Sequence, residues 1–198
     1  MTFSDSFAIE RFRELLKVDT ISHSGVSSGS YSRIAEIIQL QCIDAGLTVQ
    51  TVELVKGKPL VIATKLGSNP SLSSLLLSGH YDVVPVDFEK WTVPPFDALV
   101  KDGKIYGRGT QDMKCCLAAY IESMKRLIAN SFSSERSIHL LFLPDEEIGG
   151  WDGMGLFVQT DLFKSLNVGF ALDEGLASAT SQVPVYFGER ALCIFNLI

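Results

Sequence analysis

One histidine and seven acidic residues are the side chains of this sequence that are best suited to metal binding or proton transfer. The candidate side chains are His80, Asp82, Asp112, Asp145, Glu146, Glu147, Asp173 and Glu174. Imidazole and carboxylate groups together are typical ligands of zinc, with manganese or cobalt as alternatives. These residue types therefore point to a metal site in which a carboxylate could also transfer protons.

The ratio of acids to histidines indicates what kind of metal site these residues would form. Two carboxylates about 4 Å apart repel each other by about 4 kcal/mol at an effective dielectric constant of about 20. Protonation relieves part of that repulsion, whereas a divalent cation relieves more and uses the oxygens as ligands. Because several acids accompany a single nearby histidine, the pattern favours two metal ions that share a bridging carboxylate.

Three short apolar runs precede the candidate residues, at 75–77, 138–143 and 168–172. Runs of this length without alternation are typical of strands covered on both faces. Helical patterns at about 113–129 and 153–163 separate them, which predicts an α/β fold with a largely parallel or mixed central sheet and helices on both faces. Because the carboxyl ends of parallel strands meet at one edge, the candidate side chains should converge there.

The remaining elements flank this predicted sheet. Apolar periodicity predicts helices over 7–18 and 31–45, and strand-like segments follow at 47–54 and 60–66. A hairpin over 98–106 turns at Asp102-Gly103. The serine- and glycine-rich stretch 22–30 is expected to form a loop.

Each motif also has an ordinary structural explanation. His80 could be a capping or solvated residue, Asp112 a helix N-cap, and the acidic runs solvated turns. Taken separately, none of the motifs decides between these readings. Their common position after apolar strands is what favours a metal site.

Composition narrows the functional class. The chain has 198 residues, with 17 basic and 23 acidic side chains and a net charge of −6. An acidic chain of this kind is not expected to bind nucleic acid or an anionic membrane. No apolar run reaches the roughly 18 residues that a membrane span needs, and the first residues do not resemble a signal peptide. Four cysteines without a CxxC pair are typical of a reducing compartment, so we expect a cytoplasmic protein.

Four sequence blocks resemble a known family. The blocks are His80-Tyr81-Asp82-Val83-Val84-Pro85, Gly107-Arg108-Gly109-Thr110-Gln111-Asp112-Met113-Lys114, Pro144-Asp145-Glu146-Glu147-Ile148-Gly149-Gly150 and Ala171-Leu172-Asp173-Glu174-Gly175. Their order and spacing resemble the M20 family of dinuclear zinc peptidases and amidohydrolases. Within that family they are most similar to members that hydrolyse N-acyl-L-amino acids. The resemblance extends from the first helix to about Arg190.

The resemblance implies a set of zinc ligands. His80 and Glu174 would bind one zinc ion, Asp112 would bridge two zinc ions, and Glu147 would bind the second. The peptide bond between Asp112 and Met113 would be cis, as is typical of the family.

The resemblance also implies catalytic roles. Glu146 would act as general base toward a metal-activated water and then return the proton to the leaving amine. Asp82 would hydrogen-bond His80 so that the correct ring nitrogen faces the metal. The products would be a carboxylate and a free amino acid, so the expected partner is a small-molecule N-acyl amino acid.

Members of the family are longer than this chain. Residues 1–190 are expected to form the N-terminal portion of the zinc-dependent catalytic domain, and 191–198 an apolar tail where the family enters an inserted domain. The second zinc ion would then lack one histidine ligand, and the domain through which the family forms homodimers would be missing. The chain alone is therefore expected to be weak or inactive. Two alternatives stay open: a zinc-binding form without catalysis, and a dipeptidase or desuccinylase of the same family.

Overall fold

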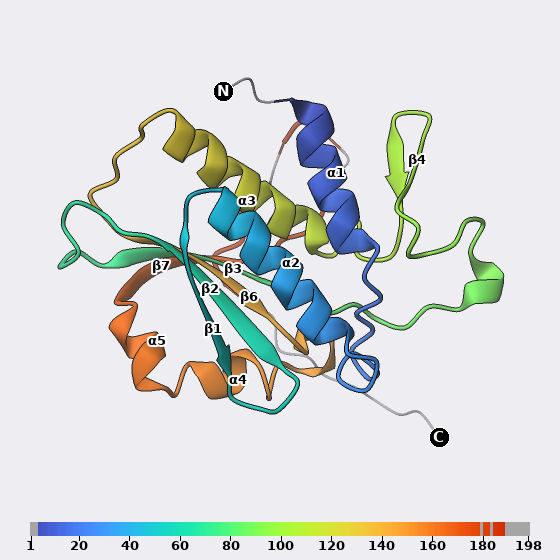
Figure 1. Cartoon of the computed structure of the whole chain (residues 1–198), viewed down its shortest axis with the longest axis horizontal. Helices are drawn as coiled ribbons and strands as arrows, with labels where there is room; N and C mark the ends of the chain where they lie inside the picture. The colour runs from blue at the N-terminus through green and yellow to red at the C-terminus, as the bar shows by residue number, and fades with distance from the viewer. Residues whose placement is uncertain (1–3, 179, 183, 189–198) are drawn as a thin grey trace.

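The computed structural model describes residues 4–178, 180–182 and 184–188 (Figure 1). The predicted apolar tail at 191–198 lies outside this range. The helices of at least ten residues are α1 (Asp5–Leu16), α2 (Ser30–Asp44) and α3 (Lys114–Ala129). The shorter helical segments are η1 (Phe88–Lys90), η2 (Glu146–Ile148), α4 (Met154–Phe157) and α5 (Asp161–Ser165). The strands are β1 (Thr48–Glu53), β2 (Pro59–Lys65), β3 (Ser74–His80), β4 (Leu99–Lys101), β5 (Lys104–Tyr106), β6 (Ile138–Leu143) and β7 (Val168–Leu172).

A five-stranded mixed sheet forms the centre of the fold, in the order β1-β2-β6-β3-β7. β1 and β2 run antiparallel to each other, and β2 runs antiparallel to β6. β3 lies parallel to both β6 and β7, so the prediction of a largely parallel or mixed sheet is confirmed. β4 and β5 form the predicted hairpin as a separate two-stranded sheet.

The register of the three parallel strands brings their carboxyl ends together. His80 at the end of β3 lies opposite Leu143 at the end of β6. Leu77 lies opposite Leu172, so β7 ends beside the last residues of β3. The segments that leave these strands therefore emerge at one edge of the sheet, as the order of apolar runs predicts.

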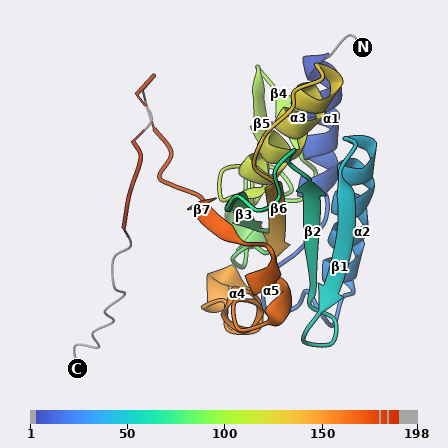
Figure 2. The same cartoon turned by 90° about the vertical axis from the view of Figure 1, so that its left-hand side faces the viewer.

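Helices cover both faces of the sheet (Figure 2), and β6 contributes residues to both hydrophobic cores. Ile138, Leu140 and Phe142 pack in the core that includes α1, α2 and α3. Leu141 and Leu143, on the alternate face, pack with α4 and α5. This alternation explains why β6 is buried along its whole length and reads as a continuous apolar run.

Two local predictions are wrong. The helix expected over 153–163 is two short helices, because the side chain of Thr160 accepts a hydrogen bond from the backbone N–H of Phe163 and so starts α5 anew. β7 is not covered on both faces, since Phe170 is 61% and Leu172 is 41% exposed. Within the described residues, the two hydrophobic cores reach only Val168 of this strand.

Among the residues that the structure describes, no helix combines the length and apolar character needed to cross a membrane.

Candidate metal centre

His80 is the innermost residue of the site at the end of β3. Its side chain is only 2% exposed, and Nδ1 lies 2.9 Å from the backbone oxygen of Asp82. Because a carbonyl oxygen can only accept a hydrogen bond, Nδ1 carries the hydrogen. The other ring nitrogen, Nε2, is therefore the one available as a ligand.

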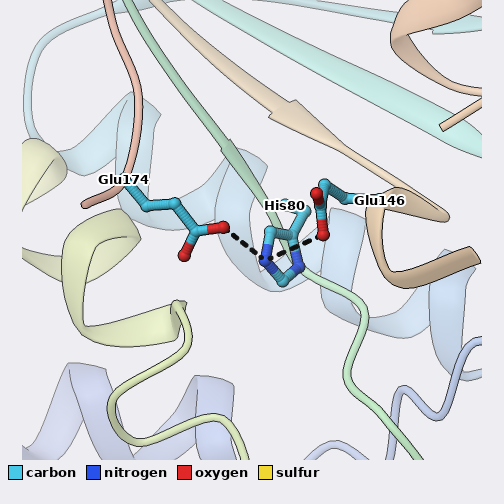
Figure 3. A group of neighbouring side chains, drawn as sticks. All are labelled: His80, Glu146 and Glu174. Atoms are coloured by element: carbon cyan, nitrogen blue, oxygen red, sulfur yellow. Dashed lines mark ion pairs between the residues drawn. The ribbon is translucent and has the colours of Figure 1, made fainter. Parts of the chain in front are cut away.

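Three carboxylates surround Nε2 of His80. Asp112 Oδ1 lies 3.1 Å away, Glu174 Oε1 lies 3.5 Å away and Glu146 Oε2 lies 3.7 Å away. Figure 3 shows the imidazole between the carboxylates of Glu146 and Glu174, which arrive from opposite sides. The end of β3, the segments that follow β6 and β7, and the turn before α3 thus meet at one nitrogen atom.

Two overlapping sets of side chains offer ligand atoms that lie within 4.8 Å of one another. The sets are His80, Glu146 and Glu174, and His80, Asp112 and Glu147. All four predicted zinc ligands therefore lie in this cluster. The predicted general base, Glu146, is itself a member of the set that contains His80 and Glu174.

Asp82 links the imidazole to the segment that carries the two glutamates. Its carboxylate is fully buried and accepts hydrogen bonds from the backbone N–H groups of Glu146, at 3.1 Å, and Glu147, at 3.2 Å. The hydroxyl of Ser22 donates a further bond at 2.9 Å. Sequence reasoning missed Ser22, because nothing in the loop 22–30 indicates that its partner lies 60 residues away.

Asp112 lies in the turn before α3, and its side chain serves the site rather than the helix. The N-cap residue of α3 is Met113, with no side-chain capping bond, so the alternative of an ordinary N-cap does not account for Asp112. The Asp112–Met113 peptide bond is cis, as the resemblance implied.

Lys114 is fully buried and donates to the backbone oxygens of Leu15, at 3.1 Å, and Val18, at 2.9 Å. It thereby joins this turn to the end of α1.

The pKa values of His80 and Glu147 show that the cluster of carboxylates lacks a balancing positive charge. Burial by itself lowers the pKa of His80, but the hydrogen bonds to Asp112, Asp82 and Glu174 outweigh burial and raise that pKa far above its ordinary value. Burial and the charge of Asp112 raise the pKa of Glu147 to about 7. Without a metal ion, His80 and Glu147 thus hold their protons more tightly, because a proton offsets part of the negative charge of the neighbouring carboxylates. The donor set of one imidazole nitrogen and four carboxylates fits zinc.

Three of the eight candidate residues belong to neither ligand set: Asp82, described above, Asp145 and Asp173. Asp145 is buried and accepts a hydrogen bond from the hydroxyl of Tyr31 at 2.7 Å. Asp173 accepts a hydrogen bond from the backbone N–H of Glu174 at 2.9 Å. The acidic runs are therefore mixtures of site residues and residues that shape the turns.

Comparison with known proteins identifies the family. The family model described as peptidase family M20/M25/M40 matches residues 76–186, which include every residue of the two ligand sets. The chain belongs to the M20 peptidase family. The structures of M20 proteins agree with this assignment: an M20 metallo-carboxypeptidase from Sulfolobus solfataricus matches 89% of the chain with a TM-score of 0.73 and 28% identity. The chain covers 38% of that carboxypeptidase.

The chain is also similar in sequence to curated proteins named aminoacylase-1. Aminoacylase-1 of Sus scrofa is 42% identical over 185 residues, and aminoacylase-1 of Homo sapiens is 40% identical over 185 residues. Each match covers 93% of this chain and 44% of the relative. The chain thus spans less than half the length of these relatives.

Proposed function

We propose that this M20 chain contributes the N-terminal portion, residues 1–190, of a zinc-dependent catalytic domain that hydrolyses N-acyl-L-amino acids. The products are a carboxylate and a free amino acid. The observation that carries the proposal is the convergence of Asp112, Glu146 and Glu174 on Nε2 of His80. The similarity to aminoacylase-1 over 93% of the chain supports the choice of an N-acyl amino acid as substrate.

In this proposal four side chains hold two zinc ions. His80 and Glu174 would bind one ion, Asp112 would be a ligand of both, and Glu147 would bind the other. Zinc would supply a Lewis acid that lowers the pKa of a bound water to about 7 and polarises the acyl carbonyl. The short distances from Nε2 to Asp112 and Glu174 support this assignment.

Glu146 is the general base in this proposal. Its side chain is 56% exposed while Nε2 of His80, 3.7 Å away, is buried, so the carboxylate stands between the cluster and the solvent. Burial and neighbouring carboxylates raise the pKa of Glu146, although His80 opposes them. A carboxyl group with a raised pKa is suited to accept a proton from water and return it to the leaving amine.

Asp82 positions these groups without touching the substrate. It lies 3.4 Å from Nδ1 of His80 and accepts the backbone N–H groups of Glu146 and Glu147. One carboxylate therefore orients the imidazole ligand and the base together.

The cysteine usage supports a cytoplasmic location for the reaction.

The proposal is tested on the purified chain with zinc content and hydrolysis measured together. We expect the chain to bind zinc, to release it to a chelator, and to hydrolyse N-acetyl-L-methionine at a low rate that chelation abolishes. An unblocked dipeptide with the same methionine is the matched control substrate and should react more slowly. Zinc binding with no hydrolysis would favour a non-catalytic role, and faster cleavage of the dipeptide would favour a dipeptidase.

A further inference from the structure

Asp145 is a buried acid that the proposed chemistry does not use. It lies between β6 and η2, directly before the two glutamates of the metal centre, with 1% of its surface exposed. Its backbone has a φ of 63°, in the left-handed region that residues other than glycine seldom adopt. Aspartate is among the few residues other than glycine that enter this region, so the position suits a buried aspartate.

Two partners from distant parts of the chain bind the Asp145 carboxylate. The hydroxyl of Tyr31, in the first turn of α2, donates to Oδ1 at 2.7 Å. The ammonium group of Lys58, directly before β2, forms an ion pair with Oδ2. We name Asp145, Tyr31 and Lys58 the Asp145 clamp.

The clamp packs directly against the residues around His80. The ring of Tyr31 meets the ring of Tyr81 edge-on, with 5.2 Å between their centroids. Tyr81 stands between His80 and Asp82 in the sequence, and its hydroxyl donates to the backbone oxygen of Pro59 at 2.7 Å. The end of β3, the start of β2 and the start of α2 are thus joined beneath the metal centre.

The turn that follows Asp145 carries the two glutamates. The backbone oxygen of Asp145 accepts the N–H of Gly150 at 2.8 Å and that of Ile148 at 3.3 Å. Within this turn, the N–H groups of Glu146 and Glu147 point to the carboxylate of Asp82. The backbone oxygen of Asp145 therefore closes the turn whose first two N–H groups bind Asp82.

We propose that Asp145 is a positioning residue, and that the Asp145 clamp fixes the turn over 145–150 so that Glu146 and Glu147 face His80. This rests on the proposed function for the role of the two glutamates. A carboxylate is required because one oxygen accepts from the Tyr31 hydroxyl while the other forms the ion pair with the Lys58 ammonium group. An asparagine amide offers one acceptor oxygen and places a donor against one of the two partners.

Amide hydrogen exchange of the metal-free chain tests the clamp. In Asp145→Asn we expect the amides of Glu146 and Glu147 to exchange about tenfold faster relative to those of β6. Cobalt or zinc affinity should fall about tenfold, the lower end of the range for loss of a group that orients ligands. Tyr31→Phe keeps the ring contact with Tyr81 and removes only the hydroxyl, so it should change both readouts in the same direction and serves if Asp145→Asn does not fold.

Asp152→Asn is the matched control. Asp152 also pairs with Lys58, at 2.6 Å, but its side chain is 47% exposed. This variant should leave the ratio of exchange rates and the metal affinity within twofold of the wild type. The clamp proposal is overturned if Asp145→Asn and Tyr31→Phe speed exchange in the turn and in β6 equally, as a purely structural role predicts. Failure of the wild-type chain to bind metal would instead overturn the proposed function, and the exchange data would still decide the role of the clamp.

Discussion

Replacing Glu146 with glutamine is expected to abolish turnover while leaving the metal in place. General acid–base catalysis contributes about 10²- to 10⁴-fold to a rate, so we expect a loss of about 10³-fold in the hydrolysis of N-acetyl-L-methionine. Glutamine keeps the size of the side chain but cannot accept and return a proton. The measurement is the steady-state rate at matched zinc content, with zinc determined by mass spectrometry of the protein solution.

Glu36→Gln provides the matched control for this variant. Glu36 is an exposed residue of α2, so the same chemical change should leave rate and zinc content unaltered. A Glu146→Gln protein that keeps more than a tenth of the wild-type rate would remove Glu146 from the role of base. A variant that loses both zinc and activity would instead make Glu146 a ligand, which its place in the set with His80 and Glu174 allows.

Glu147→Gln is expected to change metal binding and stability in opposite directions. The variant should lose the second zinc ion, because an amide is a far weaker zinc ligand than a carboxylate. Without metal, however, the variant should be more stable than the wild type at neutral pH. Zinc titration by calorimetry and thermal unfolding in a chelator measure the two effects.

The stability effect follows from the raised pKa of Glu147. In the metal-free protein, burial and the charge of Asp112 raise this pKa to about 7 from its ordinary value of 4.5. The folded state therefore holds the proton more tightly than the unfolded state, and this contribution to stability is lost as the pH rises from about 4.5 to about 7. Glutamine stays neutral, like the protonated acid, at every pH.

The melting temperatures of wild type and Glu147→Gln should accordingly be similar at pH 5 and diverge by pH 7.5, with the variant higher. Adding zinc at pH 7.5 should stabilise the wild type more than the variant, because the variant lacks the carboxylate proposed to bind the second ion. Equal melting temperatures of the two proteins at both pH values in the chelator would show that folding does not raise the pKa of Glu147.

The parallel strands and the site at their edge could be predicted because the relevant signals are local. The runs at 75–77, 138–143 and 168–172 are each followed by candidate residues, and pairing of β3 with β6 and β7 brings those residues together. Asp112 is also positioned by a local signal, the helix that follows it. Successive residues of β6 pack alternately into the two hydrophobic cores. The apolar run at this position therefore correctly predicted a central strand.

The contacts that position the site were not predictable from the sequence, because their partners are far apart in the chain. Ser22 and Asp82 are 60 residues apart, and Tyr31 and Asp145 are 114 residues apart. A serine in a polar loop or a tyrosine in a helix has no pattern that reveals such a partner. The exposure of β7 was hidden for a related reason, since an apolar run does not show how far the helices extend across the sheet.

Anomalous diffraction at the zinc edge from crystals of the chain grown with zinc tests the central claim most directly. The account predicts two peaks, one bounded by His80, Asp112 and Glu174 and the other by Asp112 and Glu147. The absence of a peak beside Nε2 of His80 at saturating zinc would contradict it, as would zinc bound only at exposed acids elsewhere on the chain.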